Sequence, residues 1–191
     1  MYPESVLHLA IALALGALSP IQPAASVSTG AAVAVCFAPE ENCAAFAVRA
    51  IDNAESEILV SAYGLTTGSG IVESLVRAKG RGVDVRLIAD KTTPCGRSSG
   101  IEPLATAGVP IWIDDQARIA HEKAMVIDET VTLIGSYNWT RGAAANSEDL
   151  NLISSPSVAA AYAAHWHNRF AVSVRFDRRE DWCRASSAGA H

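Results

Sequence analysis

From residue 32 onward, short apolar runs typical of β-strands alternate with segments whose apolar residues recur at helical spacing. The strand-like runs are residues 32–37, 57–63, 83–89 and 109–113. The helical segments that separate them are residues 43–54, 71–79 and 101–107. The run at 32–37 is apolar throughout, so we expect a buried strand there. Strand–helix–strand alternation predicts an α/β fold.

The second half of the chain adds a hairpin and a helix. Residues 120–127 and 131–135 are predicted strands joined by the short turn 128–130, and residues 157–170 are predicted to be helical. A hairpin pairs antiparallel, so the sheet should be mixed rather than purely parallel. The tail after Phe170 is charged and less regular. We therefore predict a single α/β domain, a mixed β-sheet flanked by helices.

The N-terminus has the layout of a secretory signal peptide. An apolar run at residues 6–18 is too short to span a bilayer, and small residues and prolines follow it. We expect a signal peptide over residues 1–28, a catalytic domain over 29–191, and no membrane anchor once the signal is removed. The acidic Glu4, with no preceding Lys or Arg, is atypical of a signal. The alternative is a buried N-terminal helix.

The cysteines also point to export. Four cysteines follow the predicted signal, and no Cys-x-x-Cys pair suggests a zinc site. Two disulfides in a periplasmic or secreted protein are the simpler interpretation, with four reduced cysteines in a cytosolic protein as the alternative. Three pairings are possible. Cys36 and Cys43 could meet across a turn, which would leave Cys95 with Cys183.

Composition and charge exclude some classes of protein. Half of the residues are apolar and 18% are charged, which excludes a disordered or fibrous chain. Lys and Arg number 15 against 20 Asp and Glu, a formal charge of −5. This charge argues against a strongly basic protein that coats nucleic acid, although a local basic groove on an acidic body remains compatible with a nucleic-acid enzyme.

The chemistry of the chain is concentrated between residues 121 and 148. His121 and Lys123 are two residues apart, so on a strand their side chains would share one face. An imidazole can attack phosphorus, and an ammonium can hold the phosphate oxygens as charge develops. Ser136 and Asn138 have the same spacing on the next strand and could converge on the same point. Taken singly, each residue could equally be a solvated surface group, and Asn138 also fits a glycosylation sequon.

Taken together, these residues resemble the phospholipase D superfamily. The family motif is His-x-Lys, four residues, Asp, six residues, Gly-Ser-x-Asn, and this sequence matches it without departure at His121, Lys123, Asp128, Gly135, Ser136 and Asn138. Residues 57–66, 81–90 and 146–150 and the helix with Trp166, Arg169 and Phe170 also look like their counterparts in the superfamily. The likeness is greatest to small, single-motif bacterial endonucleases that are exported and resist chelators.

The resemblance implies a role for each matched position. His121 would be the nucleophile that forms a phosphohistidine, or the acid in the partner copy, and Lys123 and Asn138 would bind the phosphate oxygens. Ser136 and Glu148 would orient the histidine.

Two motif residues are expected to be structural. Asp128 falls in the predicted turn, at the far end of the strand from His121, so we assign it a structural role. We assign the motif glycine Gly135 to the same class.

One motif does not suffice for the reaction. Cleavage needs a nucleophile and an acid, and one imidazole cannot be both in the same step. The other histidines, at positions 8, 165, 167 and 191, are not followed two residues later by Lys. We therefore expect a homodimer with one active site on its two-fold axis. No metal-binding pattern such as HExxH is present, and we expect no cofactor.

The substrate is the weaker inference. Lys91, Arg97 and Arg141 lie in loops near predicted strand ends, where a DNA or RNA backbone could run. These residues favour a non-specific, metal-independent endonuclease. A phospholipase D acting on phospholipid head groups is the alternative enzyme, and a non-catalytic module that binds phosphate or nucleic acid is the alternative without catalysis.

Overall fold

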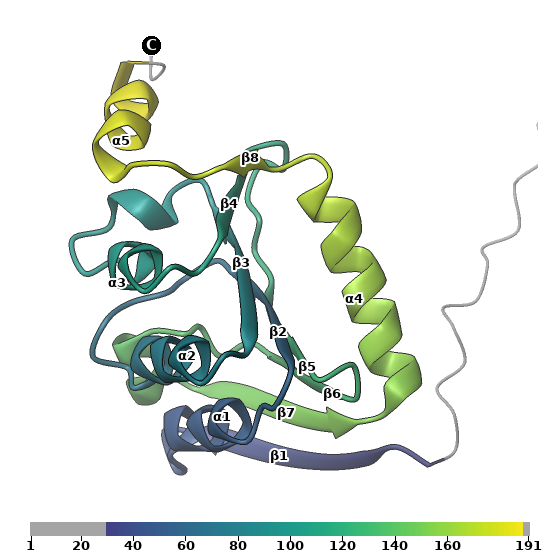
Figure 1. Ribbon diagram of the computed structural model, residues 1–191. Coiled ribbons are helices and arrows are strands. Elements are labelled where there is room, and N and C mark those ends of the chain that lie inside the picture. The colour runs from purple at the N-terminus through teal and green to yellow at the C-terminus, as the bar shows by residue number, and fades with distance from the viewer. Residues whose placement is uncertain (1–29, 189–191) are drawn as a thin grey trace, which may run out of the picture.

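A mixed β-sheet forms the centre of the computed structural model, which describes residues 30–188 (Figure 1). Eight strands of the described chain build it, in the order β1-β7-β6-β5-β2-β3-β4-β8. The strands are β1 (Ala32–Ala38), β2 (Glu57–Ala62), β3 (Asp84–Asp90), β4 (Ile111–Asp114), β5 (Lys123–Ile127), β6 (Val131–Gly135), β7 (Glu148–Ser154) and β8 (Val174–Arg175). The helices are α1 (Cys43–Asp52), α2 (Ile71–Gly80), α3 (Ile101–Thr106), α4 (Pro156–Phe170) and α5 (Arg179–Ala188), with short 3-10 turns η1 (Thr93–Cys95) and η2 (Arg141–Ala145).

The strand directions follow from the connections. β2 pairs parallel with β3, and β3 pairs parallel with β4, because α2 and α3 provide the crossovers. The hairpin β5–β6 pairs antiparallel, as do β2 with β5 and β6 with β7. The predicted fold class, a mixed sheet flanked by helices, is confirmed.

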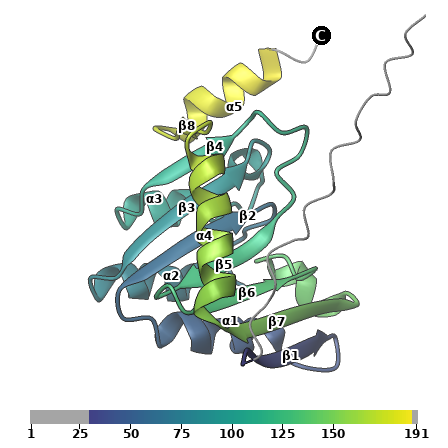
Figure 2. The same cartoon turned by 90° about the vertical axis from the view of Figure 1, so that its right-hand side faces the viewer.

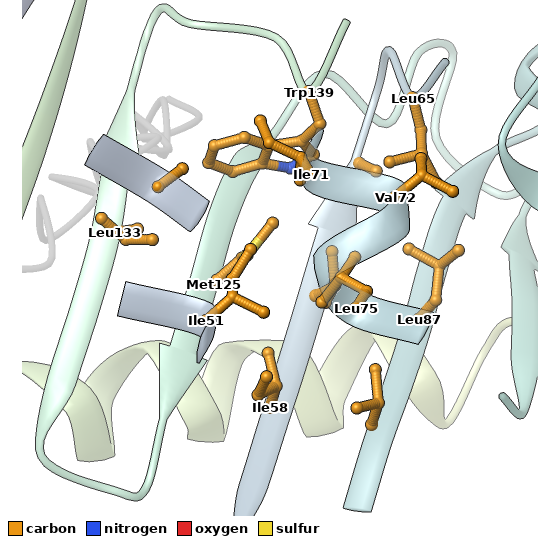
Figure 3. Packing of buried hydrophobic residues seen from close by; sticks show 14 of the residues in the cluster. Ile51, Ile58, Leu65, Ile71, Val72, Leu75, Leu87, Met125, Leu133 and Trp139 are labelled. Atoms are coloured by element: carbon orange, nitrogen blue, oxygen red, sulfur yellow. The ribbon is translucent and has the colours of Figure 1, made fainter. Parts of the chain in front are cut away.

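Helices cover both faces of the sheet. Helices α1, α2 and α3 lie against one face, and the long helix α4 crosses the other (Figures 1 and 2). The larger core fills the space under α1–α3, where Ile51, Leu75 and Met125 are completely buried (Figure 3). A smaller apolar cluster lies under α4 and includes Trp166, whose indole N–H donates to the Val60 carbonyl at 3.0 Å.

The edge of the sheet differs from the prediction. β1 is an edge strand rather than a buried one, and Val33, Val35 and Phe37 are 57%, 42% and 56% exposed. An unpredicted strand, β7, pairs with β1 along its whole length. α4 covers the middle of the sheet, so the outer side of β1 stays open at the edge.

The tail after Phe170 is more ordered than expected. It forms the short strand β8 and the helix α5, which carries Cys183. Disulfide bonds join Cys95 to Cys183 and Cys36 to Cys43. The predicted signal peptide lies outside the described residues. Within residues 30–188, no helix is long and apolar enough to cross a bilayer.

Candidate active site

The motif residues other than Asp128 gather around one cavity. It measures about 540 Å³ and is lined by His121, Lys123, Ser136, Asn138 and Glu148, among others. Three separate segments supply these side chains: the start of β5, the turn after β6 and the start of β7. The convergence of the two halves of the motif is therefore present in the folded chain.

His121 and Lys123 are in direct contact. The Lys123 Nζ lies 3.0 Å from Nδ1 and 3.2 Å from Nε2 of His121, and donates to the His121 carbonyl at 2.6 Å. We had expected His121 to lie on a strand over residues 120–127. β5 begins only at Lys123, so His121 precedes the strand. The two side chains meet all the same. A ring nitrogen can accept from the ammonium only when it carries no proton, which is the form a nucleophile requires.

The ring of Tyr63 packs against both members of this pair. The ring of Tyr63 lies 4.4 Å from the His121 ring between centroids, and the Lys123 Nζ lies 4.9 Å from the centre of the same Tyr63 ring. Lys123 is only 7% exposed. This burial lowers the pKa of its ammonium below the ordinary value, and the Glu148 carboxylate counteracts part of the shift.

In the second half of the motif, side chains that point into the core alternate with side chains that line the cavity. Tyr137 and Trp139 point into the core and are fully buried, and the Trp139 indole N–H donates to the Ser61 carbonyl at 3.1 Å. Ser136 and Asn138 alternate with them and line the cavity. The Tyr-x-Trp pattern was a signal for this anchoring that the sequence analysis did not use.

The motif glycine has a steric reason. A Cβ atom at Gly135 would lie 2.2 Å from the Asp149 carbonyl oxygen on β7. Only glycine allows β7 to approach this closely, which brings Glu148 to the cavity. Its structural assignment thus has a physical basis.

Ser136 and Glu148 both make hydrogen bonds to residues on or next to β7. The Ser136 Oγ accepts from the Asp149 N–H at 3.0 Å, and Glu148 accepts from the Asn146 amide at 3.1 Å. Within the described residues neither side chain makes a hydrogen bond to His121. The expected orienting contacts are therefore absent from this arrangement, although both side chains line the cavity.

Asp128 lies at the opposite end of β5. Its carboxylate accepts hydrogen bonds from the Glu55, Ser56 and Glu57 N–H groups and from the Ser56 hydroxyl, at 2.7–3.0 Å. Burial raises its pKa, but these four bonds outweigh that effect and leave the pKa below the ordinary value. Asp128 thus ties the β5–β6 turn to the start of β2.

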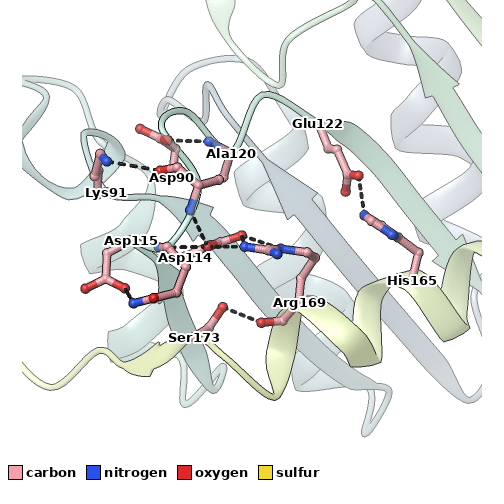
Figure 4. Close-up of polar contacts among 11 residues, drawn as sticks. Asp90, Lys91, Asp114, Asp115, Ala120, Glu122, His165, Arg169 and Ser173 are labelled. Atoms are coloured by element: carbon pink, nitrogen blue, oxygen red, sulfur yellow. Dashed lines mark hydrogen bonds and ion pairs between the residues drawn. The ribbon is translucent and has the colours of Figure 1, made fainter. Parts of the chain in front are cut away.

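Two side chains from α4 reach the same region and were missed by sequence reasoning. His165 Nε2 lies 2.6 Å from the Glu122 carboxylate (Figure 4). Tyr162 lines the cavity, and burial, reinforced by Glu122, raises its pKa. These contacts span some forty residues of sequence, so no local pattern could reveal them.

The predicted substrate-binding residues do not line the cavity. Lys91 is half-buried, and its Nζ donates to the Ala117 carbonyl at 3.0 Å, so it braces a loop. Arg97 and Arg141 are exposed on neighbouring loops, which are joined through Thr66 and Thr67. Of the three predicted residues, Arg97 and Arg141 have exposed side chains that a substrate backbone could reach.

Metal chemistry has no candidate site in the described part of the chain. Residues 30–188 contain no group of three or more His, Cys, Asp and Glu side chains that could hold a metal ion. The cavity instead offers an imidazole, an ammonium and an amide. Such groups can bind a phosphate and supply a nucleophile.

Comparisons with known proteins agree with this geometry. A family model described as "Cardiolipin synthase, PLD-like domain" matches residues 47–170. A phospholipase D from Rickettsia conorii is 34% identical over 158 residues, which cover 82% of this chain and 78% of that protein. A mitochondrial cardiolipin hydrolase from Chlamydomonas reinhardtii is 33% identical over 97 residues, which cover 50% of this chain and 44% of that protein.

The fold is also similar to solved structures. The crystal structure of Nuc, a phospholipase D family member from Salmonella typhimurium, matches with a TM-score of 0.72 and 31% identity, covering 78% of this chain and 99% of that one. NucT from Helicobacter pylori shares the fold at 19% identity, with a TM-score of 0.70, and the match covers 76% of this chain and 99% of that one. The chain therefore belongs to the phospholipase D superfamily and is a phosphodiester hydrolase.

Proposed function

We propose that this hydrolase is an exported endonuclease that cleaves nucleic acid without a metal ion, through a phosphohistidine on His121. The observation that carries the proposal is the contact of His121 with Lys123 in the active-site cavity, near exposed arginines on the surrounding loops. Within the described residues, the guanidinium groups of Arg97, Arg118 and Arg141 make no hydrogen bond or ion pair, so they are available to backbone phosphates.

The proposed reaction needs two imidazoles. A neutral His121 nitrogen attacks phosphorus while the bond from phosphorus to the leaving oxygen breaks, and a protonated imidazole gives that oxygen its proton. The second imidazole, now neutral, then takes a proton from water, whose oxygen attacks phosphorus and releases His121. Lys123 and Asn138 hold the remaining phosphate oxygens through both steps.

A second copy of the chain supplies the other imidazole. The cavity is lined by one histidine, His121, and the nearby His165 is bound to Glu122. Phe37, exposed at the sheet edge, pairs in register with Asp149, which is hydrogen-bonded to Ser136. The open apolar side of β1 therefore adjoins the cavity and suits a two-fold contact that places two cavities together.

Export is supported by the covalent structure. Two disulfide bonds are typical of proteins in oxidising compartments. We therefore propose that the chain acts in the periplasm or outside the cell. The signal peptide expected at residues 1–28 is part of this proposal.

A phospholipase activity is the second candidate. The relatives named above are a phospholipase D and a cardiolipin hydrolase. Ile119, which lies two residues before His121, is 43% exposed and could touch a lipid.

One set of assays separates these candidates. The purified chain is incubated in excess EDTA with supercoiled plasmid and, separately, with phosphatidylcholine vesicles. We expect plasmid nicking that is lost in His121→Ala and kept in His167→Ala, a control at an exposed histidine of α4. Nicking that returns only with added metal would overturn the mechanism. Choline release without nicking would replace the nuclease by the lipid enzyme.

A further inference from the structure

A second cavity shares His121 and Glu122 with the active-site cavity. It measures about 250 Å³ and extends toward the loop between β4 and β5. Its apolar wall consists of Ala62, Ile88, Ala117, Ile119 and Ala120. None of the motif residues other than His121 lines it, so the proposed chemistry leaves this space without a role.

The charged groups in this cavity are already paired. Asp114 is 2% exposed, and its carboxylate accepts from Nε and Nη2 of Arg169, each at 2.7 Å (Figure 4). The same carboxylate accepts from the Gln116 N–H at 3.2 Å. The Asp114–Arg169 pair is neutral as a unit, and the Glu122 carboxylate, where the two cavities meet, lies 2.6 Å from His165 Nε2. The rest of the wall is mainly apolar and favours an uncharged group.

Hydrogen bonds with Asp90 and Lys91 hold the loop that forms the outer wall of the cavity. The buried carboxylate of Asp90 accepts from the Ala120 N–H at 2.7 Å, next to His121 (Figure 4). The Lys91 ammonium donates to the Ala117 carbonyl at 3.0 Å. These contacts fix both ends of the short wall before any ligand arrives, which is the condition for a preformed subsite.

We propose that this cavity is a subsite for the uncharged organic group attached to the phosphate that His121 and Lys123 hold. The inference rests on the proposed function. A phosphodiester carries an organic group on each of two oxygens, and a phosphate at His121 places one of these groups beside the cavity. The volume accommodates a group about the size of a nucleobase. Burial of the faces of such a group against the apolar wall favours its binding.

Binding of phosphate monoesters tests the subsite, because each carries a single organic group. Calorimetry compares methyl phosphate with thymidine 5′-phosphate and with dihexanoylglycerol 3-phosphate. We expect the wild-type chain to bind one of the larger esters at least tenfold more tightly than methyl phosphate. The ester that gains identifies the source of the group as a nucleoside or an acylglycerol.

Two variants fill the cavity. Ala117→Phe places a ring inside it, and Ile119→Trp narrows its mouth from an exposed position where the core is not disturbed. Each should reduce the preference for the larger ester to within about twofold, whereas Ala105→Phe, a matched change at an exposed position of α3, should keep it. Thermal unfolding checks that each variant is folded, and Ile119→Trp decides alone if Ala117→Phe is not.

The outcomes separate the subsite from the proposed function. Absence of a preference in the wild type, or a preference that both filling variants retain, overturns the subsite. Turnover of bis(4-nitrophenyl) phosphate by the wild type is measured in parallel. If turnover is present and the preference is absent, the subsite alone is wrong. If the wild type shows neither turnover nor phosphate binding, the proposed function fails and the subsite with it.

Discussion

The aromatic ring of Tyr63 packs against the imidazole of His121, with centroids 4.4 Å apart and ring planes inclined by 49°. The two residues meet because β2 and β5 are antiparallel neighbours, and the Tyr63 N–H extends the pairing by donating to the Glu122 carbonyl at 3.0 Å. The same ring lies under the Lys123 ammonium. One side chain thus contacts both the proposed nucleophile and the proposed phosphate-binding cation.

Removing the Tyr63 ring should reduce turnover. We expect Tyr63→Leu to lower kcat by about ten- to hundredfold, because small displacements of catalytic groups are costly. Tyr63→Phe should stay within about threefold of wild type, since the ring and its contact with the ammonium remain. The measurement is kcat and KM with bis(4-nitrophenyl) phosphate.

A matched control exists on α1. The Arg49 guanidinium lies 5.9 Å from the ring centre of Phe46, away from the cavity. Phe46→Leu removes a comparable contact and should leave kcat unchanged. If Tyr63→Leu retains the wild-type kcat, Tyr63 has no positioning role.

Asp128 should contribute to stability rather than to catalysis. Asp128→Asn weakens four hydrogen bonds to a carboxylate, and we expect it to lower the free energy of unfolding by about 1–3 kcal/mol at pH 7. kcat should stay within about threefold of wild type under conditions where the variant is folded. Urea unfolding monitored by circular dichroism gives the first quantity, and Glu129→Gln in the same turn is the control.

The pH dependence of this contribution has a definite sign. The pKa of Asp128 in the folded chain is lower than its ordinary value of 3.8, so the contribution is complete above that value. It is lost as the pH falls through the folded pKa. The difference between wild type and Asp128→Asn should therefore be largest near neutral pH and shrink in acid. A difference that grows in acid would contradict the assignment.

Local patterns in the sequence were enough to predict most of the fold. The elements from β1 to α4 have clear strand or helix periodicity, except β7, whose EDLNLIS sequence mixes acidic and apolar residues. β7 is held in the sheet by pairing with β1 and β6. β1 is distant from it in sequence, and η2 separates β6 from it. Strand formation of this kind depends on tertiary context more than on propensity, so the edge position of β1 was missed as well.

The candidate site shows the same division. The motif spacing predicted that His121, Lys123, Ser136 and Asn138 would line one cavity, because the hairpin that joins them is local. Tyr63 lies far from the motif in sequence, and only the register of β2 on β5 brings it there. A single sequence contains no information on such pairing.

The disulfide between Cys95 and Cys183 should be a major source of stability. It closes a separation of 88 residues and holds α5 against η1, where the Trp182 indole N–H also donates to the Lys91 carbonyl at 3.0 Å. We expect Cys95→Ala combined with Cys183→Ala to lower the free energy of unfolding by about 2–4 kcal/mol, measured by urea unfolding. Cys95 is exposed, so a reductant can reach the bond. If reduction leaves the free energy of unfolding of the wild type unchanged, the bond contributes little to stability.

The proposed sharing of one active site between two copies of the chain can be tested directly, because the reaction needs two imidazoles. Wild-type chain is mixed with His121→Ala, and the subunits are allowed to exchange. Each mixed dimer has one His121 and should be inactive, because the reaction needs a nucleophile and an acid at the same time. Random pairing in a two-fold dimer makes activity fall as the square of the wild-type fraction, so about a quarter remains at an equal mixture. Exchange is verified with two distinguishable affinity tags. A linear fall despite verified exchange would mean that each chain holds a complete site, and a second acid, Glu148 or His165, would then have to act within the chain.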